Sequence, residues 1–162
     1  MKILIIFASY FGNTEKIAAE IAAGFGPEHD VRVIKAEEFQ LDQLRDIKLL
    51  IVGSPTRAFR PAPILSICLK AIPKNGLAGI QVTAFDTRIA LENIKSGLLR
   101  SLVKIMGYAA NPLAKTLVKK GGILAAPPLG FHVQDTEGPL TKGEAEKAAG
   151  WAVTILAGIL SQ

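Results

Sequence analysis

The sequence contains only one cysteine and has no long apolar run. These two features exclude a disulfide-stabilised protein and a membrane-spanning one. A single cysteine, Cys68, excludes an internal disulfide and fits a reducing compartment, so we expect a cytoplasmic protein. Cys68 itself lies in an apolar helical stretch and is expected to be buried. No apolar stretch reaches the ~20 residues that a membrane-spanning helix needs, so no span is expected. The apolar run after Met1 leads into a glycine-containing turn, which predicts a first strand rather than a signal peptide.

Two well-known nucleotide-binding motifs are absent as well. No G-x-G-x-x-G follows the first predicted strand, which disfavours a dinucleotide-binding domain, and no G-x-x-x-x-G-K-[ST] occurs, which disfavours a P-loop hydrolase. The net charge is +5, but lysines and arginines are scattered and are not interleaved with aromatic residues, so nucleic-acid binding has little support. His29 and His132 lie in different predicted elements, so neither a metal site nor histidine acid–base catalysis is predicted.

The sequence does contain a regular alternation of apolar runs and helical patterns. Strands are predicted at 3–8, 31–36, 49–52 (ending at Gly53), 80–85 and 123–126, the last with a continuation at 131–133. Helices are predicted from Thr14 to Gly26, and over 41–44, 63–72, 112–120 and 142–160. Asn111 is the expected N-cap of the fourth helix, and Thr141 to Glu144 reads as a capping box for the fifth. Strands separated by helices predict one α/β domain over 1–162, with a parallel sheet covered on both faces.

Polar segments follow three of the buried strands. They are Ser9–Thr14, Ser54–Pro61 and Asp86–Arg88. In a doubly wound sheet, ligands bind at the carboxyl ends of the strands, near the point where the strand order reverses. Because all three segments fall at this edge, the sequence predicts a ligand site there.

The first of these segments, Ser9–Thr14, carries the features of an anion site. Backbone N–H groups at a helix N-terminus lack internal partners and carry a positive partial charge, so they attract phosphate. Gly12 lets the backbone curve closely around an anion. The hydroxyls of Ser9 and Thr14 and the amide of Asn13 add donors. The alternative is that Asn13 or Thr14 only caps the helix, although this leaves the other hydroxyl and the glycine unexplained.

Taken together, the segments resemble a known family. Ser9-Tyr10-Phe11-Gly12-Asn13-Thr14 resembles the phosphate loop of flavodoxins, and Gly53–Arg57 is similar to the second flavin loop of flavodoxin-like proteins, including quinone reductases. Phe85–Arg88 falls where the third flavin loop follows the fourth strand. Gly130–Val133 with Thr136–Leu140 resembles the end of some members. The resemblance implies FMN as cofactor and a doubly wound, five-stranded parallel sheet of order 2-1-3-4-5.

The resemblance also implies the cofactor-binding residues. The ribityl phosphate would contact Ser9, Tyr10, Phe11, Gly12, Asn13 and Thr14, and the isoalloxazine would lie between Pro55, Thr56, Arg57, Ala58, Phe59 on one side and Asp86, Thr87, Arg88 on the other. Phe11 departs from the family, which often has a hydroxyl residue there. Phe59 is the only aromatic residue of the second loop, and it either stacks on the flavin or packs against nearby prolines. Trp151 is expected in the core.

The implied function is electron transfer by an FMN-binding, flavodoxin-like protein. An FMN-dependent NAD(P)H:quinone-type oxidoreductase is the first alternative, and a flavin-free binding module of the same fold is the second. Arg57 is a candidate for stabilising negative charge near the flavin, and no catalytic or metal-binding residue is assigned. Familiar flavodoxins are acidic and dock onto basic partners. This chain is basic, so its protein partner is expected to be acidic or neutral.

One segment does not fit the simplest version of this fold. Between Arg88 and Asn111 the sequence has an additional helical pattern over 91–106, with Leu98 and Leu102 on a broad apolar face. Ordinary core packing is the default expectation. A lid over the site and an interface between copies of the chain are the alternatives.

Overall fold

The computed structural model describes residues 1–161, except for the side chain of Ile105, and its strands and helices alternate as expected. The strands are β1 (Lys2–Phe7), β2 (Asp30–Lys35), β3 (Leu49–Pro55), β4 (Gln81–Ile89), β5 (Ile123–Leu124) and β6 (Leu129–Val133). The α-helices are α1 (Asn13–Gly24), α2 (Pro63–Ala71), α3 (Gly97–Met106), α4 (Ala110–Lys119) and α5 (Glu144–Leu160). Three short 3-10 helices are η1 (Ala36–Glu38), η2 (Leu41–Leu44) and η3 (Leu91–Asn93).

The sheet is parallel throughout and has the order β2-β1-β3-β4-β5, which confirms the predicted doubly wound fold. The fifth strand is divided, so that β5 pairs with the first part of β4 and β6 pairs with its second part. Pro127 and Pro128 lie between the two pieces. Proline has no N–H group and therefore cannot continue a hydrogen-bonded strand, which explains the division.

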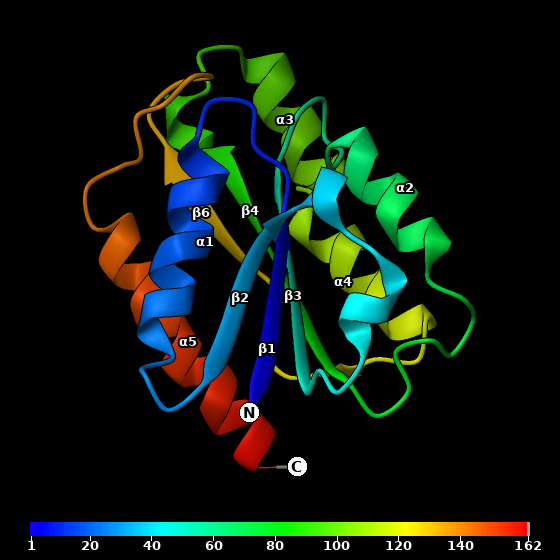
Figure 1. Cartoon of the computed structure of the whole chain (residues 1–162). Helices are drawn as coiled ribbons and strands as arrows, with labels where there is room; N and C mark the ends of the chain where they lie inside the picture. The colour runs from blue at the N-terminus through cyan, green and yellow to red at the C-terminus, as the bar shows by residue number, and fades with distance from the viewer. Residues whose placement is uncertain (162) are drawn as a thin grey trace.

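Helices cover both faces of the sheet, as Figure 1 shows, with α1 and α5 on one face and α2 and α4 on the other. Side chains of a strand alternate between the faces, so each central strand contributes to both cores. Leu4 and Ile6 pack towards α2 and α4, whereas Ile3 and Ile5 pack towards α1 and α5. Trp151 is buried in the core between the sheet and the helices α1 and α5, as expected.

Two strands run further than predicted. β3 continues past Gly53 to Pro55, and β4 continues past Phe85 to Ile89, so Asp86–Arg88 belong to a strand and not to a turn. The ends of these strands pair with each other, Ser54 opposite Asp86. Gly53 is needed within β3 because any Cβ there would collide with the ring of Phe85.

The two predicted helix caps are wrong. α4 begins at Ala110, after Ala109 rather than after Asn111, and its first N–H donates to the Asp86 carboxylate at 2.7 Å. The Asp86 carboxylate of β4 therefore caps the N-terminus of α4. α5 begins at Glu144, after Gly143 in a left-handed conformation, and the side chain of Thr141 makes no capping bond there.

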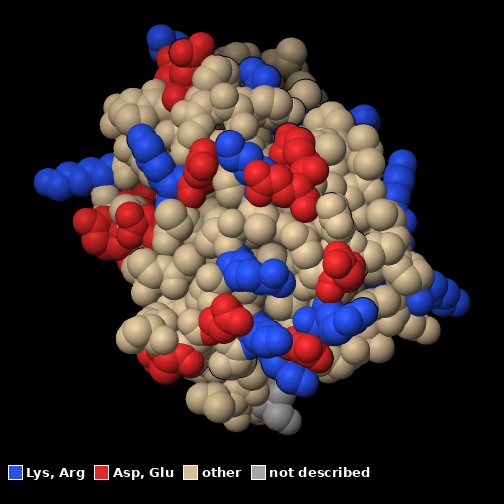
Figure 2. Space-filling view, viewed as in Figure 1, with Lys and Arg blue, Asp and Glu red and all other residues tan. Residues whose placement is uncertain are grey.

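Charges on the face of the molecule drawn in Figure 2 are mixed, with lysine and arginine side chains beside aspartate and glutamate. This agrees with the scattered distribution of basic residues in the sequence. Within residues 1–161, no helix is long and apolar enough to cross a membrane.

Candidate functional site

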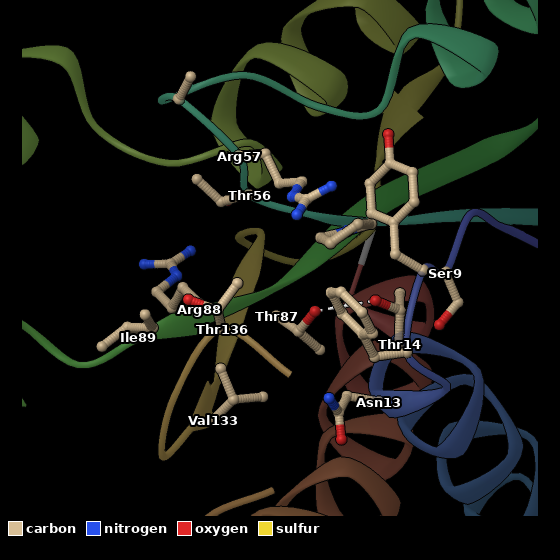
Figure 3. A pocket seen from close by; sticks show the side chains of 14 residues that line it. Ser9, Asn13, Thr14, Thr56, Arg57, Thr87, Arg88, Ile89, Val133 and Thr136 are labelled. Carbon is tan, nitrogen blue, oxygen red and sulfur yellow. Dashed lines mark hydrogen bonds between the residues drawn. The ribbon is translucent and has the colours of Figure 1, made fainter. Parts of the chain in front are cut away.

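A cleft opens at the carboxyl ends of β1, β3 and β4, and its volume is about 250 Å³. Figure 3 shows side chains from the loops after β1 and β3 and from the end of β4 arranged around it. The predicted site residues that line it are Ser9, Tyr10, Phe11, Asn13, Thr14, Pro55, Thr56, Arg57, Ala58, Thr87 and Arg88. The remaining predicted residues, Gly12, Phe59 and Asp86, are not part of its lining.

Three lining residues were not predicted, namely Ile89, Val133 and Thr136. Ile89 is the last residue of β4, and Val133 is the last residue of β6. The rule that ligands bind at the carboxyl ends of strands would have found Val133 and Thr136 if it had been applied to the continuation strand at 131–133.

The loop after β1 leads directly into the N-terminus of α1. Gly12 precedes the helix with a φ of 84°, a conformation that glycine adopts without steric cost. The Gly12 N–H donates to Ser9 Oγ at 3.0 Å, which closes the loop. Neither Asn13 nor Thr14 caps the helix, so the capping alternative is wrong. The first N–H groups of α1 consequently form an open site for an anion.

The two polar side chains at the start of α1 connect it to other parts of the cleft. The Thr14 hydroxyl is buried and lies 2.8 Å from the Thr87 hydroxyl of β4 (Figure 3). Asn13 Nδ2 donates to the Glu137 carbonyl at 3.0 Å. Gly138 is required beside this amide, since its φ is 104° and an ideal Cβ would lie 2.7 Å from Asn13 Nδ2. Asn13 thus holds the segment after β6 against the loop after β1.

The loop after β3 is a tight hairpin. Arg57 and Arg60 exchange backbone hydrogen bonds of 3.1 and 2.9 Å, and the two residues between them, Ala58 and Phe59, have φ values of 46° and 64°. Such a two-residue turn normally contains glycine or asparagine, so these side chains impose backbone strain at the edge of the cleft. Phe59 is half-buried beside the cleft rather than in it.

Arg57 connects this hairpin to the loop after β1. Its guanidinium carbon lies 4.7 Å from the ring centroid of Tyr10 and 5.6 Å from that of Phe11. Both distances are within the range of a cation–π interaction. A positive charge therefore lies over the loop at whose end α1 begins.

Asp86 and Arg88 form a buried ion pair beside the cleft. Arg88 donates from Nε and Nη2 to the Asp86 carboxylate at 2.5 and 2.7 Å, and its guanidinium carbon lies 3.8 Å from the Tyr108 ring centroid. Burial raises the pKa of the Asp86 carboxyl above its ordinary value, while the hydrogen bonds from Arg88 and the Ala110 N–H oppose this change. The pair fixes the segment before α4 to the end of β4.

The cleft is suited to an anion. None of the described residues that line it is acidic, whereas Arg57 and Arg88 are both among them. The hydroxyls of Ser9, Thr14 and Thr87 and the N-terminus of α1 add neutral donors. No group of three or more histidine, cysteine, aspartate or glutamate side chains within the described residues is placed to hold a metal ion.

Comparisons with known proteins agree with the fold. No family model matches the chain. A flavodoxin of Picosynechococcus sp. is 40% identical over 55 residues, which is 34% of this chain and 32% of the relative, so the match spans about a third of the relative's length.

Solved structures match over nearly the whole chain. Oxidised Flavodoxin 1 from Bacillus cereus has a TM-score of 0.74 at 19% identity, covering 97% of this chain and 98% of that one. A WrbA-like flavodoxin from Agrobacterium tumefaciens has a TM-score of 0.70 at 18% identity, covering 99% of both chains. The predicted resemblance to flavodoxins is therefore confirmed for the fold, and part of the sequence is similar to a flavodoxin as well.

Proposed function

We propose that the protein binds FMN in this cleft and transfers electrons between redox partners, as a flavodoxin-like carrier. The observation that supports this most is the chemistry of the cleft, which combines a helix N-terminus, the hydroxyls of Ser9, Thr14 and Thr87 and two arginines, with no carboxylate among the described residues that line it. These groups fit a phosphate dianion. They lie at the carboxyl edge of a doubly wound sheet, which is where such folds generally bind ligands.

Each wall of the cleft has a separate role in this proposal. The N–H groups at the start of α1, with Ser9 and Thr14, hold the phosphate. The hairpin residues Pro55–Ala58 and the end of β4 bracket the flavin ring. FMN supplies the redox chemistry when bound, and the protein supplies orientation and electrostatics. Asp86, fully buried, acts through Arg88 rather than on the ligand.

The Thr14–Thr87 pair supports a phosphate site of this kind. Each hydroxyl has one proton, and only one proton is needed for the bond between them. The other hydroxyl proton can therefore be donated to an anion. A hydrogen bond to a charged group contributes about 1.5–3 kcal/mol, roughly twice the contribution of a neutral one.

An FMN-dependent oxidoreductase is the second candidate. The rings of Tyr10 and Phe11 line the cleft and are 49% and 45% exposed, so a planar acceptor such as a quinone has a surface on which to stack. Steady-state turnover with NAD(P)H and a quinone distinguishes the two candidates. A carrier shows little turnover without a protein partner, whereas an enzyme shows sustained quinone reduction.

FMN and riboflavin titrations of the apoprotein test the central proposal. Riboflavin lacks the phosphate, so it should bind at least about tenfold more weakly than FMN, because the charge-assisted hydrogen bonds are lost. Equal affinities would overturn the phosphate site. Absence of any flavin binding would favour the flavin-free module.

The protein partner proposed from the sequence is acidic or neutral, because the chain carries a net charge of +5. The cytoplasmic location inferred from the single cysteine stays a prediction. Cys68 is buried as expected, and burial raises the pKa of its thiol, so it remains a neutral side chain within the core.

A further inference from the structure

Apolar side chains are exposed on α3 and on α4, and the two helices differ in where their lysines lie. On α3, Leu98 is 75% exposed and Leu102 is 37% exposed, so the expectation that 91–106 is ordinary core is wrong for this side of the helix. Lys104 lies two residues from Leu102 and therefore projects from the opposite side of α3. Nothing in the structure shows what covers this surface, so the lid and the interface between copies stay predictions.

α4 forms one wall of an apolar groove at the edge of the sheet. The helix covers the same face as α2 (Figure 1), and β5 beside it is the last strand in the order of the sheet. The volume of the groove is about 410 Å³, compared with about 250 Å³ for the cleft. The residues that form most of its lining are Ala114, Lys115, Val118, Lys119, Leu124 and Pro128.

The groove offers apolar surface to a ligand. Val118 is 45% exposed and Leu124 is 41% exposed, although both side chains are apolar. From Asn111 to Lys119 the groove extends for about 12 Å along α4, at a rise of about 1.5 Å per residue. Its volume lies within the range of roughly 300–1,000 Å³ that is typical of pockets for small ligands.

Two lysines belong to the wall of the groove itself. Lys115, Val118 and Lys119 are spaced three and four residues apart, so they share one face of α4. Both lysines are exposed, and neither takes part in an ion pair within the described residues. Like charges four residues apart on a helix repel each other. An anion bound between the two ammonium groups would relieve this repulsion.

The surrounding sequence supplies no carboxylate for these lysines. None of the described residues that line the groove is acidic. No aspartate or glutamate occurs between Glu92 and Asp135, a stretch that includes all of α4 and β5. The groove therefore combines an apolar surface with two positive charges, which selects a negatively charged ligand with an apolar body.

We infer that the groove binds a small amphipathic carboxylate of the fatty-acid type, with its alkyl chain against Val118 and Leu124 and its carboxylate between the two lysines. The alkyl chain displaces water from exposed apolar side chains, which is favourable. The lysine stems add apolar surface, while their ammonium groups reach the carboxylate. An extended decanoate has about the length of the groove. This site is separate from the cleft and does not depend on the proposed function.

Larger occupants fit the groove less well. A stable protein interface generally involves about 20–30 residues on each side, far more than the short helix and strand that form this groove. A second copy of the chain would also bring two lysine pairs into one symmetric contact, where like charges oppose association. Helices that lie on a membrane carry their charges opposite the apolar side, whereas the lysines of α4 share a face with Val118.

The test compares decanoate with decylammonium, which has the same alkyl chain and a positive head group, in titrations followed by backbone amide NMR. Decanoate should shift the amide signals of Val118 and Lys119. It should bind at least about tenfold more tightly than decylammonium, because only the carboxylate is attracted by the lysines. The amide signals of Gly12 and Thr14 report on the cleft separately, so the result is independent of FMN binding.

Two matched pairs of variants locate the ligand. Val118→Ser and Leu98→Ser each remove an exposed apolar side chain, the first from α4 and the second from α3. Lys119→Gln and Lys104→Gln each remove one charge from the last turn of a ten-residue helix. Both α4 variants should weaken decanoate binding about fivefold to tenfold, whereas both α3 variants should leave it within about twofold.

Several results would overturn the proposal. Equal affinities for decanoate and decylammonium would exclude the role of the lysines, and amide shifts confined to the cleft or to α3 would exclude the groove. Absence of binding at millimolar decanoate would exclude the site. A mass in solution that falls from dimer to monomer with Val118→Ser would assign the groove to a second copy. Sedimentation with phosphatidylserine vesicles that Val118→Ser abolishes would assign it to a membrane.

Discussion

The loop after β1 and the end of β4 both reach the cleft, but they present their polar residues differently. In the loop, Gly12 reverses the chain with a φ of 84°, so that successive residues curve around one point at the start of α1. In β4 the chain stays extended, so Thr87 reaches the Thr14 hydroxyl across the cleft, while Asp86 lies outside the cleft and pairs with Arg88, which lines it. A polar sequence therefore identifies a site only when the backbone conformation turns each side chain towards it.

This difference distinguishes Thr14 and Thr87, which we expect to bind the ligand, from Asp86 and Arg88, which stabilise the fold. Thr14 and Thr87 bond to each other across the cleft, which leaves one of their two hydroxyl protons for a ligand. The Asp86 carboxylate is fully buried and already accepts from Arg88 and from the first N–H of α4. We expect substitutions at the first pair to change flavin affinity, and substitutions at the second pair to change stability.

The largest effect is expected for Asp86→Ala. It leaves Arg88 without its carboxylate in a largely buried position and removes the acceptor for Ala110, so the free energy of unfolding should fall by about 3–5 kcal/mol. Urea unfolding measures this loss. The double variant Asp86→Ala with Arg88→Ala should recover part of it, because no unpaired charge remains. A loss below about 1 kcal/mol would contradict a buried, structural pair.

A second prediction concerns the pair that faces the cleft. Thr14→Ala should weaken FMN binding about tenfold to a hundredfold, by the 1.5–3 kcal/mol of a hydrogen bond to a charged group. Riboflavin affinity should stay unchanged. Thr87→Ala removes the same threonine–threonine bond and is the control for stability. Equal losses of FMN and riboflavin affinity in Thr14→Ala would show that the hydroxyl does not bind the phosphate.

The sequence predicted the buried strands, the parallel sheet and the edge of the sheet at which the cleft opens. It did not predict where β3 and β4 end. The apolar patterns stop at Gly53 and Phe85, but the strands continue because Ser54 and Asp86 pair with each other, a contact between residues far apart in the chain. The start of α4 was misplaced for the same reason, since the acceptor for its first N–H comes from β4.

The apolar pattern of 91–106 predicted a helix, and the structure has one over Gly97–Met106, after the short 3-10 helix Leu91–Asn93, but the pattern did not predict what surrounds it. Periodicity shows that a helix has an apolar side, and it does not show what covers that side. Likewise, Arg57 was expected near the flavin, and its position over the rings of Tyr10 and Phe11 depends on how two separate loops meet. Such contacts between distant segments are set by the fold as a whole.

A third prediction uses the two arginines of the hairpin. Arg57→Gln should weaken FMN binding about fivefold to tenfold, because it removes the positive charge above the loop that precedes α1. Arg60→Gln removes the same charge from the exposed partner of Arg57 in the hairpin and is the matched control. Its FMN affinity should stay within about twofold of the unaltered protein. If both substitutions weaken binding equally, the effect is one of net charge and Arg57 has no specific role.

The smallest effects test the backbone at both sides of the cleft. Gly12 and Ala58 have left-handed conformations, with φ values of 84° and 46°, but only Gly12 is a glycine. An ideal Cβ at Gly12 would meet nothing within 4 Å, so Gly12→Ala changes only the backbone energy and should lower the free energy of unfolding by about 1 kcal/mol. Ala58→Gly removes strain of the same kind. It should raise the free energy of unfolding by about 0.5–1 kcal/mol, since the entropy lost by glycine on folding offsets part of the gain. Urea unfolding of both variants provides the comparison. If both substitutions lowered the free energy of unfolding, the hairpin at Arg57–Arg60 would not be strained at Ala58.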